Sequence, residues 1–209
     1  MKVSICTGVL NQSGFLKAMI ASVIGQSFKD WELIIVDDGS TEDIKSVCDD
    51  WNDERIKYHR FQENKGVPHG INHALSLATG EYVGLLSADE RLDLNKLLWQ
   101  VGYLDDHPEI GGIWGLPQNG ELGERPEHEQ YALRAHNRSR LAWIRTLLNL
   151  ENIPIGGASW LVRKSVLDDI GHFDPQFYSC SDLELFVRFF QKYEGRIFPY
   201  RWAWEEPNP

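Results

Sequence analysis

Two acidic segments of the sequence follow apolar runs of strand length. Asp37 and Asp38 come directly after the run 32–36, and Asp89 follows the run 82–86 after two small residues. In an open parallel sheet, ligands gather outside the carboxyl ends of the strands. Carboxylates there can accept hydrogen bonds from ribose hydroxyls or a base imide, and they can bind a hard divalent cation shared with a phosphate. A plain turn before a helix cap is the alternative for the first segment, and a solvated loop is the alternative for the second.

A third carboxylate, Asp182, stands just before the strongly apolar helix expected at 183–193. A carboxylate within hydrogen-bond reach of a reacting hydroxyl can take its proton. The competing interpretation is a helix cap, since the helix dipole favours a carboxylate there by about 0.3 to 1 kcal/mol. Glu184 and Arg188 lie four residues apart and are expected to pair on one face of this helix.

The elements that must position these carboxylates alternate between strand-like and helix-like patterns, which predicts βαβ units and an α/β fold. Ser13 and Asp93 are expected to cap helices, and Pro68 is expected to open one. The charged, turn-rich segment 117–138 is the expected boundary between two parts of one compact unit. Strands are expected at 2–7, 32–36, 56–61, 82–86, 110–116 and 158–162, and helices at 15–24, 44–51, 68–78, 94–104, 141–150 and 183–193.

Composition excludes several classes of protein. The 209 residues, 42% of them hydrophobic, are enough for one well-buried core. No apolar run approaches the roughly 20 residues that cross a bilayer, and the N-terminus lacks a leader, so a soluble cytoplasmic protein is expected, with peripheral membrane association left open. The net charge of -10 argues against nucleic acid as a partner, so an anionic ligand would need a metal or helix dipoles. The three cysteines suggest neither a disulfide framework nor a zinc cluster, and Cys6 and Cys48 are expected to be core thiols.

Short motifs in a fixed order along the chain give a resemblance to a known family. They are Val3–Ile5 with Asn11, Gln26–Phe28, Glu32–Thr41, Asn64–Gly66, Asn72, Gly80–Tyr82 and Ser87–Glu90. In this order they resemble the inverting glycosyltransferases of family 2. The resemblance implies the GT-A fold of nucleotide-diphospho-sugar transferases, with a Rossmann-like mixed sheet flanked by helices. Residues 1–116 would bind the nucleotide-sugar donor, and residues 117–209 would form the acceptor-binding part of the same domain. The sequence shows no evident closing element at its end, so a piece of a longer protein is an open expectation.

The same resemblance implies roles for individual residues. Asp182 would be the catalytic base that deprotonates the acceptor hydroxyl, and Asp89 would hold Mn²⁺ or Mg²⁺ against the donor diphosphate. Asp38 would contact the nucleotide base, with a UDP-linked sugar as the expected donor. The other donor contacts would be Thr7, Gly8, Val9, Asn11, Asp37, Gly66, Asn72, Ser87 and Ala88. The acceptor, a glycan or another hydroxyl compound in polysaccharide biosynthesis, would contact Gly157, Ala158 and Ser181. Trp160 follows this turn and is expected to stack on a sugar ring of the acceptor, with packing in the core as the alternative, and Glu184 could orient the base or the acceptor.

Departures from the family pattern keep other functions open. Ser87 stands where relatives often carry an aspartate, Glu90 replaces a frequent aspartate, and no histidine follows His172 to serve as a further metal ligand. A non-catalytic sugar-nucleotide or glycan-binding module of a larger synthase is therefore the main alternative. A nucleotidyltransferase is disfavoured because no Gly-rich loop with an early lysine or arginine follows the first strand, and a phosphoacceptor receiver would leave the motif before the last helix unexplained. His69 and His73 could form a ligand pair on one helix, although surface roles are favoured.

Overall fold

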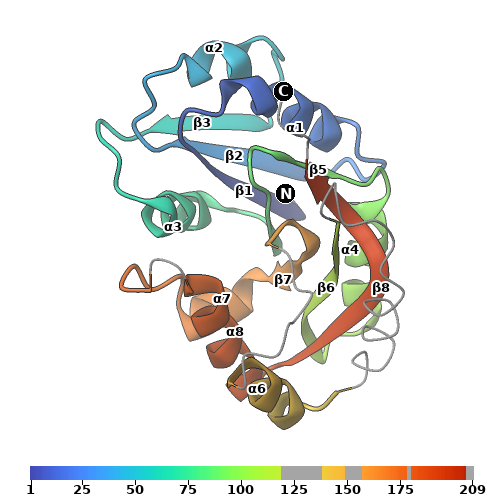
Figure 1. Cartoon of the computed structure of the whole chain (residues 1–209). Helices are drawn as coiled ribbons and strands as arrows, with labels where there is room; N and C mark the ends of the chain where they lie inside the picture. Colours follow the sequence, from blue (N-terminus) through green and yellow to red (C-terminus); the bar gives the residue numbers. More distant parts are fainter. Residues whose placement is uncertain (119–137, 149–156, 178–179, 206–209) are drawn as a thin grey trace.

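The computed structural model describes residues 1–118, 138–148, 157–177 and 180–205 (Figure 1). The expected boundary segment 117–138 therefore lies almost wholly outside the described residues. In chain order the described elements are β1 (Val3–Val9), α1 (Ser13–Ile24), β2 (Trp31–Asp37), α2 (Ile44–Asp49), β3 (Ile56–Arg60), α3 (Val67–Leu77), β4 (Tyr82–Leu85), β5 (Glu90–Leu92), α4 (Lys96–Asp106), β6 (Ile110–Gln118), α6 (Arg140–Leu148), the 3-10 turn η1 (Gly157–Ser159), β7 (Leu161–Arg163), α7 (Lys164–Ile170), α8 (Ser181–Lys192) and β8 (Glu194–Glu205).

The described strands form one mixed sheet in the order β3-β2-β1-β4-β7-β6-β8-β5. The first four are parallel to one another, as the predicted βαβ units require. β7 runs antiparallel to β4 and β6, whereas β8 runs parallel to β6 and antiparallel to β5. Because β2 and β4 flank β1 in parallel, the segments bearing Asp38 and Asp89 leave the same edge of the sheet, with β1 between them.

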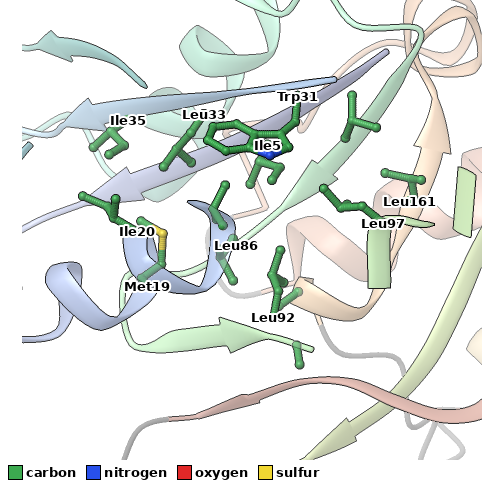
Figure 2. Close-up of a cluster of buried hydrophobic side chains, with 14 of the residues drawn as sticks. Ile5, Met19, Ile20, Trp31, Leu33, Ile35, Leu86, Leu92, Leu97 and Leu161 are labelled. Carbon is green, nitrogen blue, oxygen red and sulfur yellow. The ribbon is translucent and has the colours of Figure 1, made fainter. Parts of the chain in front are cut away.

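Apolar side chains cover both faces of the sheet, as parallel strands require. All seven residues of β2 are buried. On one face, α1 packs Met19 and Ile20 toward Trp31 and its neighbours (Figure 2). On the other face, α3, α7 and α8 contribute a second cluster that includes Phe186 and Phe189. Full burial of one side chain of this size contributes about 1.5 to 3 kcal/mol, so the two clusters hold the strand ends firmly in place.

The predictions for the first half of the chain agree with β1 to β4 within two residues at each end. Cys6 and Cys48 are buried free thiols, as predicted. Two predicted helix caps are wrong. Ser13 is the first residue of α1, and its N–H donates to the Glu42 carboxylate; Asn95 rather than Asp93 precedes α4. In both places a polar side chain from another segment satisfies the helix start, which local pattern does not reveal.

The sequence patterns do not predict three of the elements, β5, α7 and β8. β8 has twelve residues, and it joins the sheet between β6 and β5. Pro199 and the charged residues within this segment hide its strand character, since proline cannot donate to a sheet ladder. The predicted boundary near 116 falls inside β6, so strands from both parts of the chain share one sheet.

Candidate active site

A hollow lies at the carboxyl ends of β1 and β2, where the sequence predicts the donor site. Its volume is about 110 Å³, and it extends from the ends of these strands to the start of α3. Its lining brings together the predicted donor contacts Gly8, Val9, Asp38 and Gly66. The remaining lining residues are Leu10, Gln12, Asn64, Val67 and Gly70.

A larger hollow of about 990 Å³ lies beside α2 and β3, and its lining includes Trp51 and Tyr58. It contains none of the residues predicted to bind donor, metal or acceptor. The smaller hollow is the better candidate, because parallel strands end there in a carboxylate and ligands of such sheets bind at those ends.

Asp38 builds one wall of the small hollow. Its side chain is almost fully buried, and its two oxygens accept the backbone N–H groups of Lys65 (2.7 Å) and Gly66 (2.8 Å). Gly39 permits this approach, because its φ is +78° and a Cβ at this position would lie 2.7 Å from the backbone nitrogen of Asn64. Each carboxylate oxygen can accept a further hydrogen bond, so Asp38 shapes the hollow and keeps acceptor capacity for a ligand N–H.

Asp37 is fully buried, and the protein itself uses its carboxylate. One oxygen accepts the N–H of Ser40 (2.8 Å), and the other accepts the Tyr58 hydroxyl (2.7 Å) with Arg60 at 3.5 Å. Burial, together with this bond to Asp37, raises the pKa of Tyr58 to about 12. Asp37 thus fixes the turn that presents Asp38, and its burial favours an indirect part in donor binding over the direct contact expected.

Asn11 joins the end of β1 to the end of β2. It has a positive φ of 52°, its N–H donates to the Ser40 hydroxyl, and its side-chain oxygen accepts both the N–H and the hydroxyl of Thr41. Thr7, buried two residues before the strand ends, has a hydroxyl with no partner among the described residues. Asn11, a predicted donor contact, therefore uses its side chain to hold the loop at Ser40 and Thr41, whereas the hydroxyl of Thr7 is unpaired in the described structure.

Asp89 lies between β4 and β5 and is half-buried. No hydrogen bond or ion pair engages its carboxylate within the described part of the chain. The exposed Ser87 donates its N–H to the Glu90 carboxylate (2.9 Å), and Ala88 is buried between them. Within this turn, the Glu90 carboxylate is hydrogen-bonded, whereas the Asp89 carboxylate remains available for a ligand.

The chemistry of Asp89 fits a hard divalent cation. Magnesium keeps several waters and is bound through one or two carboxylates plus substrate phosphates, so it does not need a full protein cage. No group of three or more His, Cys, Asp or Glu side chains suited to a metal occurs among the residues that the structure describes. A metal at Asp89 would thus complete its coordination with water and a ligand phosphate.

Asp182 is exposed in the first turn of α8, where it is not the helix cap. Cys180 occupies the cap position without a side-chain bond, and one Asp182 oxygen accepts the N–H of Leu183 (2.7 Å). Its other oxygen faces no partner in the described structure. Ser181 precedes it and is half-buried. The carboxylate is therefore accessible to an incoming hydroxyl.

The segment before α8 is fixed to α3 and to α8 itself. Asn72 donates to the carbonyl of Phe173 (2.7 Å) and accepts its N–H (3.0 Å), across 101 residues of sequence. Arg188 forms the predicted pair with Glu184 and also donates to three carbonyls, those of residues 170 to 172. Asn72 and Glu184, expected to touch donor and acceptor, thus hold the protein segment that leads to Asp182.

The predicted acceptor contacts around η1 differ in their exposure. Gly157 is exposed, whereas Ala158 and Trp160 are buried. The Trp160 indole lies edge-on to Phe173 and Phe186, with ring centroids 6.5 and 6.1 Å away. Burial favours a packing role for Trp160 over sugar stacking, and leaves Gly157 as the accessible member of this turn.

Other residues of interest carry no motif signal in the sequence. Lys96 and Gln100 are buried polar side chains that donate to the backbone carbonyls of residues 159 and 160 at the end of η1, a burial that only the tertiary structure reveals. His73 lies near His59 with ring centroids 5.6 Å apart, and burial lowers the pKa of His59. His69, the predicted partner of His73 on α3, is exposed. The ring of His73 instead contacts His59 of β3.

Comparisons with known proteins agree with this architecture. S. aureus TarS, solved in complex with UDP-GlcNAc, superposes with a TM-score of 0.82 at 17% identity, covering 100% of this chain and 59% of that chain. The mannosyltransferase PcManGT from Pyrobaculum calidifontis, solved with GDP-Man and Mn²⁺, gives a TM-score of 0.73 at 19% identity, covering 98% and 56%. The fold is that of the GT-A glycosyltransferases.

The sequence comparisons identify the family. The model of glycosyl transferase family 2 matches residues 4–171. The uncharacterized glycosyltransferase RP339 of Rickettsia prowazekii is 27% identical over 192 residues, which cover 90% of this chain and 58% of that protein. The chain belongs to glycosyltransferase family 2, and it spans less than two thirds of the length of the relatives described here. Among the described residues, no helix is both long and apolar enough to cross a membrane.

Proposed function

We propose that this protein transfers a sugar from a nucleotide-diphosphate sugar to a hydroxyl group of a glycan or another acceptor, with inversion at the transferred carbon. The observation that carries the proposal is the hollow lined by Asp38, with the unengaged Asp89 leaving the same edge of the sheet. The UDP-GlcNAc bound by TarS favours UDP as the nucleotide. Residues 1–116 supply the donor part, and residues from 117 onward supply the acceptor part.

Asp89 is the residue that would hold Mn²⁺ or Mg²⁺ in this proposal. Its free carboxylate and the Mn²⁺ in PcManGT support the assignment. A divalent metal bound there would offset the negative charge that develops on the departing diphosphate. The N-terminal end of α3 borders the donor hollow and adds a favourable dipole for the phosphates.

Asp182 is the proposed general base. It takes the proton of the acceptor hydroxyl while the hydroxyl oxygen forms its bond to the anomeric carbon. The bond from that carbon to the diphosphate oxygen breaks in the same displacement, and its electron pair leaves with the diphosphate. A single displacement inverts the anomeric centre and needs no covalent enzyme intermediate. The exposed position of Asp182 supports this role.

Calorimetry with UDP- and GDP-sugars, with and without Mn²⁺, tests the donor assignment. Metal-strengthened binding of one nucleotide sugar is expected, together with slow hydrolysis of that donor when no acceptor is present. Binding without metal dependence or turnover would instead identify a non-catalytic nucleotide-sugar module. No binding of any nucleotide sugar would remove the proposed function.

Two variants with one control test the individual carboxylates. Asp89→Asn should abolish the metal-dependent part of donor affinity. Asp182→Asn should lower turnover by about 10²- to 10⁴-fold and leave donor binding intact, as expected for loss of a general base. Asp106→Asn, at the exposed end of α4, is the control and should behave as wild type. Wild-type turnover in Asp182→Asn would refute the assignment of the base.

A further inference from the structure

Lys96 is a lysine whose buried position disfavours a charged side chain. It is the first residue of α4, and only 1% of its surface is exposed. Burial lowers the pKa of Lys96 to about 7, and the charge of Glu90 opposes this shift. Taking an ammonium group out of water is expensive, and an apolar side chain of similar volume is often equally stable or more stable in such a place. Stability alone does not account for a lysine here.

The hydrogen bonds of Lys96 point to η1. The ammonium group donates to the side-chain oxygen of Gln100 (2.7 Å) and to the carbonyl of Trp160 (3.2 Å). Gln100, one helical turn further along α4, donates to the carbonyl of Ser159 (2.8 Å). Two consecutive carbonyls at the end of η1 are therefore held by two side chains that also bind each other. We call Lys96 and Gln100 the bracket.

The bracket joins two parts of the candidate site. η1 packs against β4 and β5, the strands that precede and follow Asp89. Glu90, beside Asp89, is the charge that acts on Lys96. Gly157, the exposed residue of η1, is one of the expected acceptor contacts. A shift of η1 would thus alter the geometry beside the strand end that carries the proposed metal ligand.

We propose that Lys96 and Gln100 are positioning residues for sugar transfer, which hold η1 in register with the Asp89 segment so that donor and acceptor meet correctly. The inference rests on the proposed function. The bracket touches neither substrate, since both of its side chains are buried. Its effect on the reaction runs through the backbone of residues 159 and 160.

Lys96→Met tests the bracket, because methionine keeps an unbranched side chain of similar length and removes the charge and the donor. The melting temperature is expected to stay close to that of wild type or to rise. Amide hydrogen exchange at residues 158 to 161 should become faster, and turnover should fall by about 10- to 100-fold with donor affinity unchanged, as small misplacements of reacting groups cost this much. Gln100→Met should produce the same pattern in weaker form, and Lys17→Met, an exposed lysine paired only with Asp50 in the described structure, is the control.

The outcomes distinguish a positioning role of the bracket from a purely structural one. Wild-type turnover or unchanged exchange at η1 in Lys96→Met would overturn the inference. Loss of folding in both bracket variants would assign a structural role and overturn it equally. If the wild-type protein neither binds nor turns over any nucleotide sugar, the proposed function fails, while the exchange measurement still shows whether the bracket holds η1.

Discussion

Replacing Asn72 by alanine would separate two roles for this residue, support of the fold and contact with the donor. The change removes both bonds between the Asn72 side chain and the backbone of Phe173 (2.7 and 3.0 Å). An unpaired buried polar group costs about 1 to 3 kcal/mol, and the half-buried site places the total for the two groups near 2 to 3 kcal/mol. With an unfolding entropy of about 2.1 cal/mol/K per residue, the 209-residue chain should lose about 5 to 7 °C in melting temperature.

The decisive comparison is between stability, donor affinity and turnover in the same variant. Asn72 does not line the donor hollow, so calorimetry should give a donor affinity equal to that of wild type. Turnover should fall, because the segment that leads to Asp182 loses its anchor on α3. Ser76→Ala, on the exposed side of α3, is the matched control. A tenfold loss of donor affinity (about 1.4 kcal/mol) without a change in melting temperature would show that Asn72 contacts the donor and refute this reasoning.

Three further predictions concern the framework of the site. Gly39→Ala should abolish donor binding, because its Cβ would collide with the backbone of residues 63 and 64 and displace the segment held by Asp38; retained affinity in calorimetry would contradict this. Burial opposes ionisation of Glu32, but hydrogen bonds from Lys57, Ser4 and Thr79 outweigh it and lower the pKa to about 2. Its carboxylate should contribute about 2 to 3 kcal/mol above pH 4.5 that is lost as the pH falls through 2, so urea unfolding of Glu32→Gln should show a flatter acid limb than wild type. For Lys96, the unfolded chain binds the proton more tightly than the folded chain does, so stability should rise with pH between 7 and 10.5. Over this range the wild-type free energy of unfolding should gain roughly 4 to 5 kcal/mol relative to that of Lys96→Met. A constant difference between the two proteins would contradict the lowered pKa of Lys96.

The donor half of the fold could be predicted because its signals are local. The runs 32–36 and 82–86 are continuous apolar strands, and the residues that follow them are the turn formers and acids that end such strands. The two strand ends share one edge because both neighbours of β1 run parallel to it, which the βαβ pattern already implies. The hollow at Asp38 lies at these strand ends, and its lining includes Gly8, Val9, Asp38 and Gly66, which the sequence predicts as donor contacts.

The roles of polar side chains were harder to predict, because their partners lie far away in sequence. Whether Asn72 faces a ligand or Phe173 depends on a contact across 101 residues. Whether Asp37 is accessible depends on Tyr58, which arrives from the neighbouring strand. The partners of Lys96 and Gln100 at residues 159 and 160 come from the second half of the chain. Sequence periodicity describes one element at a time and contains none of this information.

The order of the sheet leaves β3 as an outer strand, paired only with β2 within the described structure. An outer strand has a free row of backbone donors and acceptors, which invites edge-to-edge aggregation. β3 has only five residues, and two of them, Lys57 and Arg60, carry charged side chains that pair with Glu32 and Asp37 of β2. Short length and charged side chains both oppose the addition of a second β3 from another molecule, which protects this edge against self-association through strand pairing.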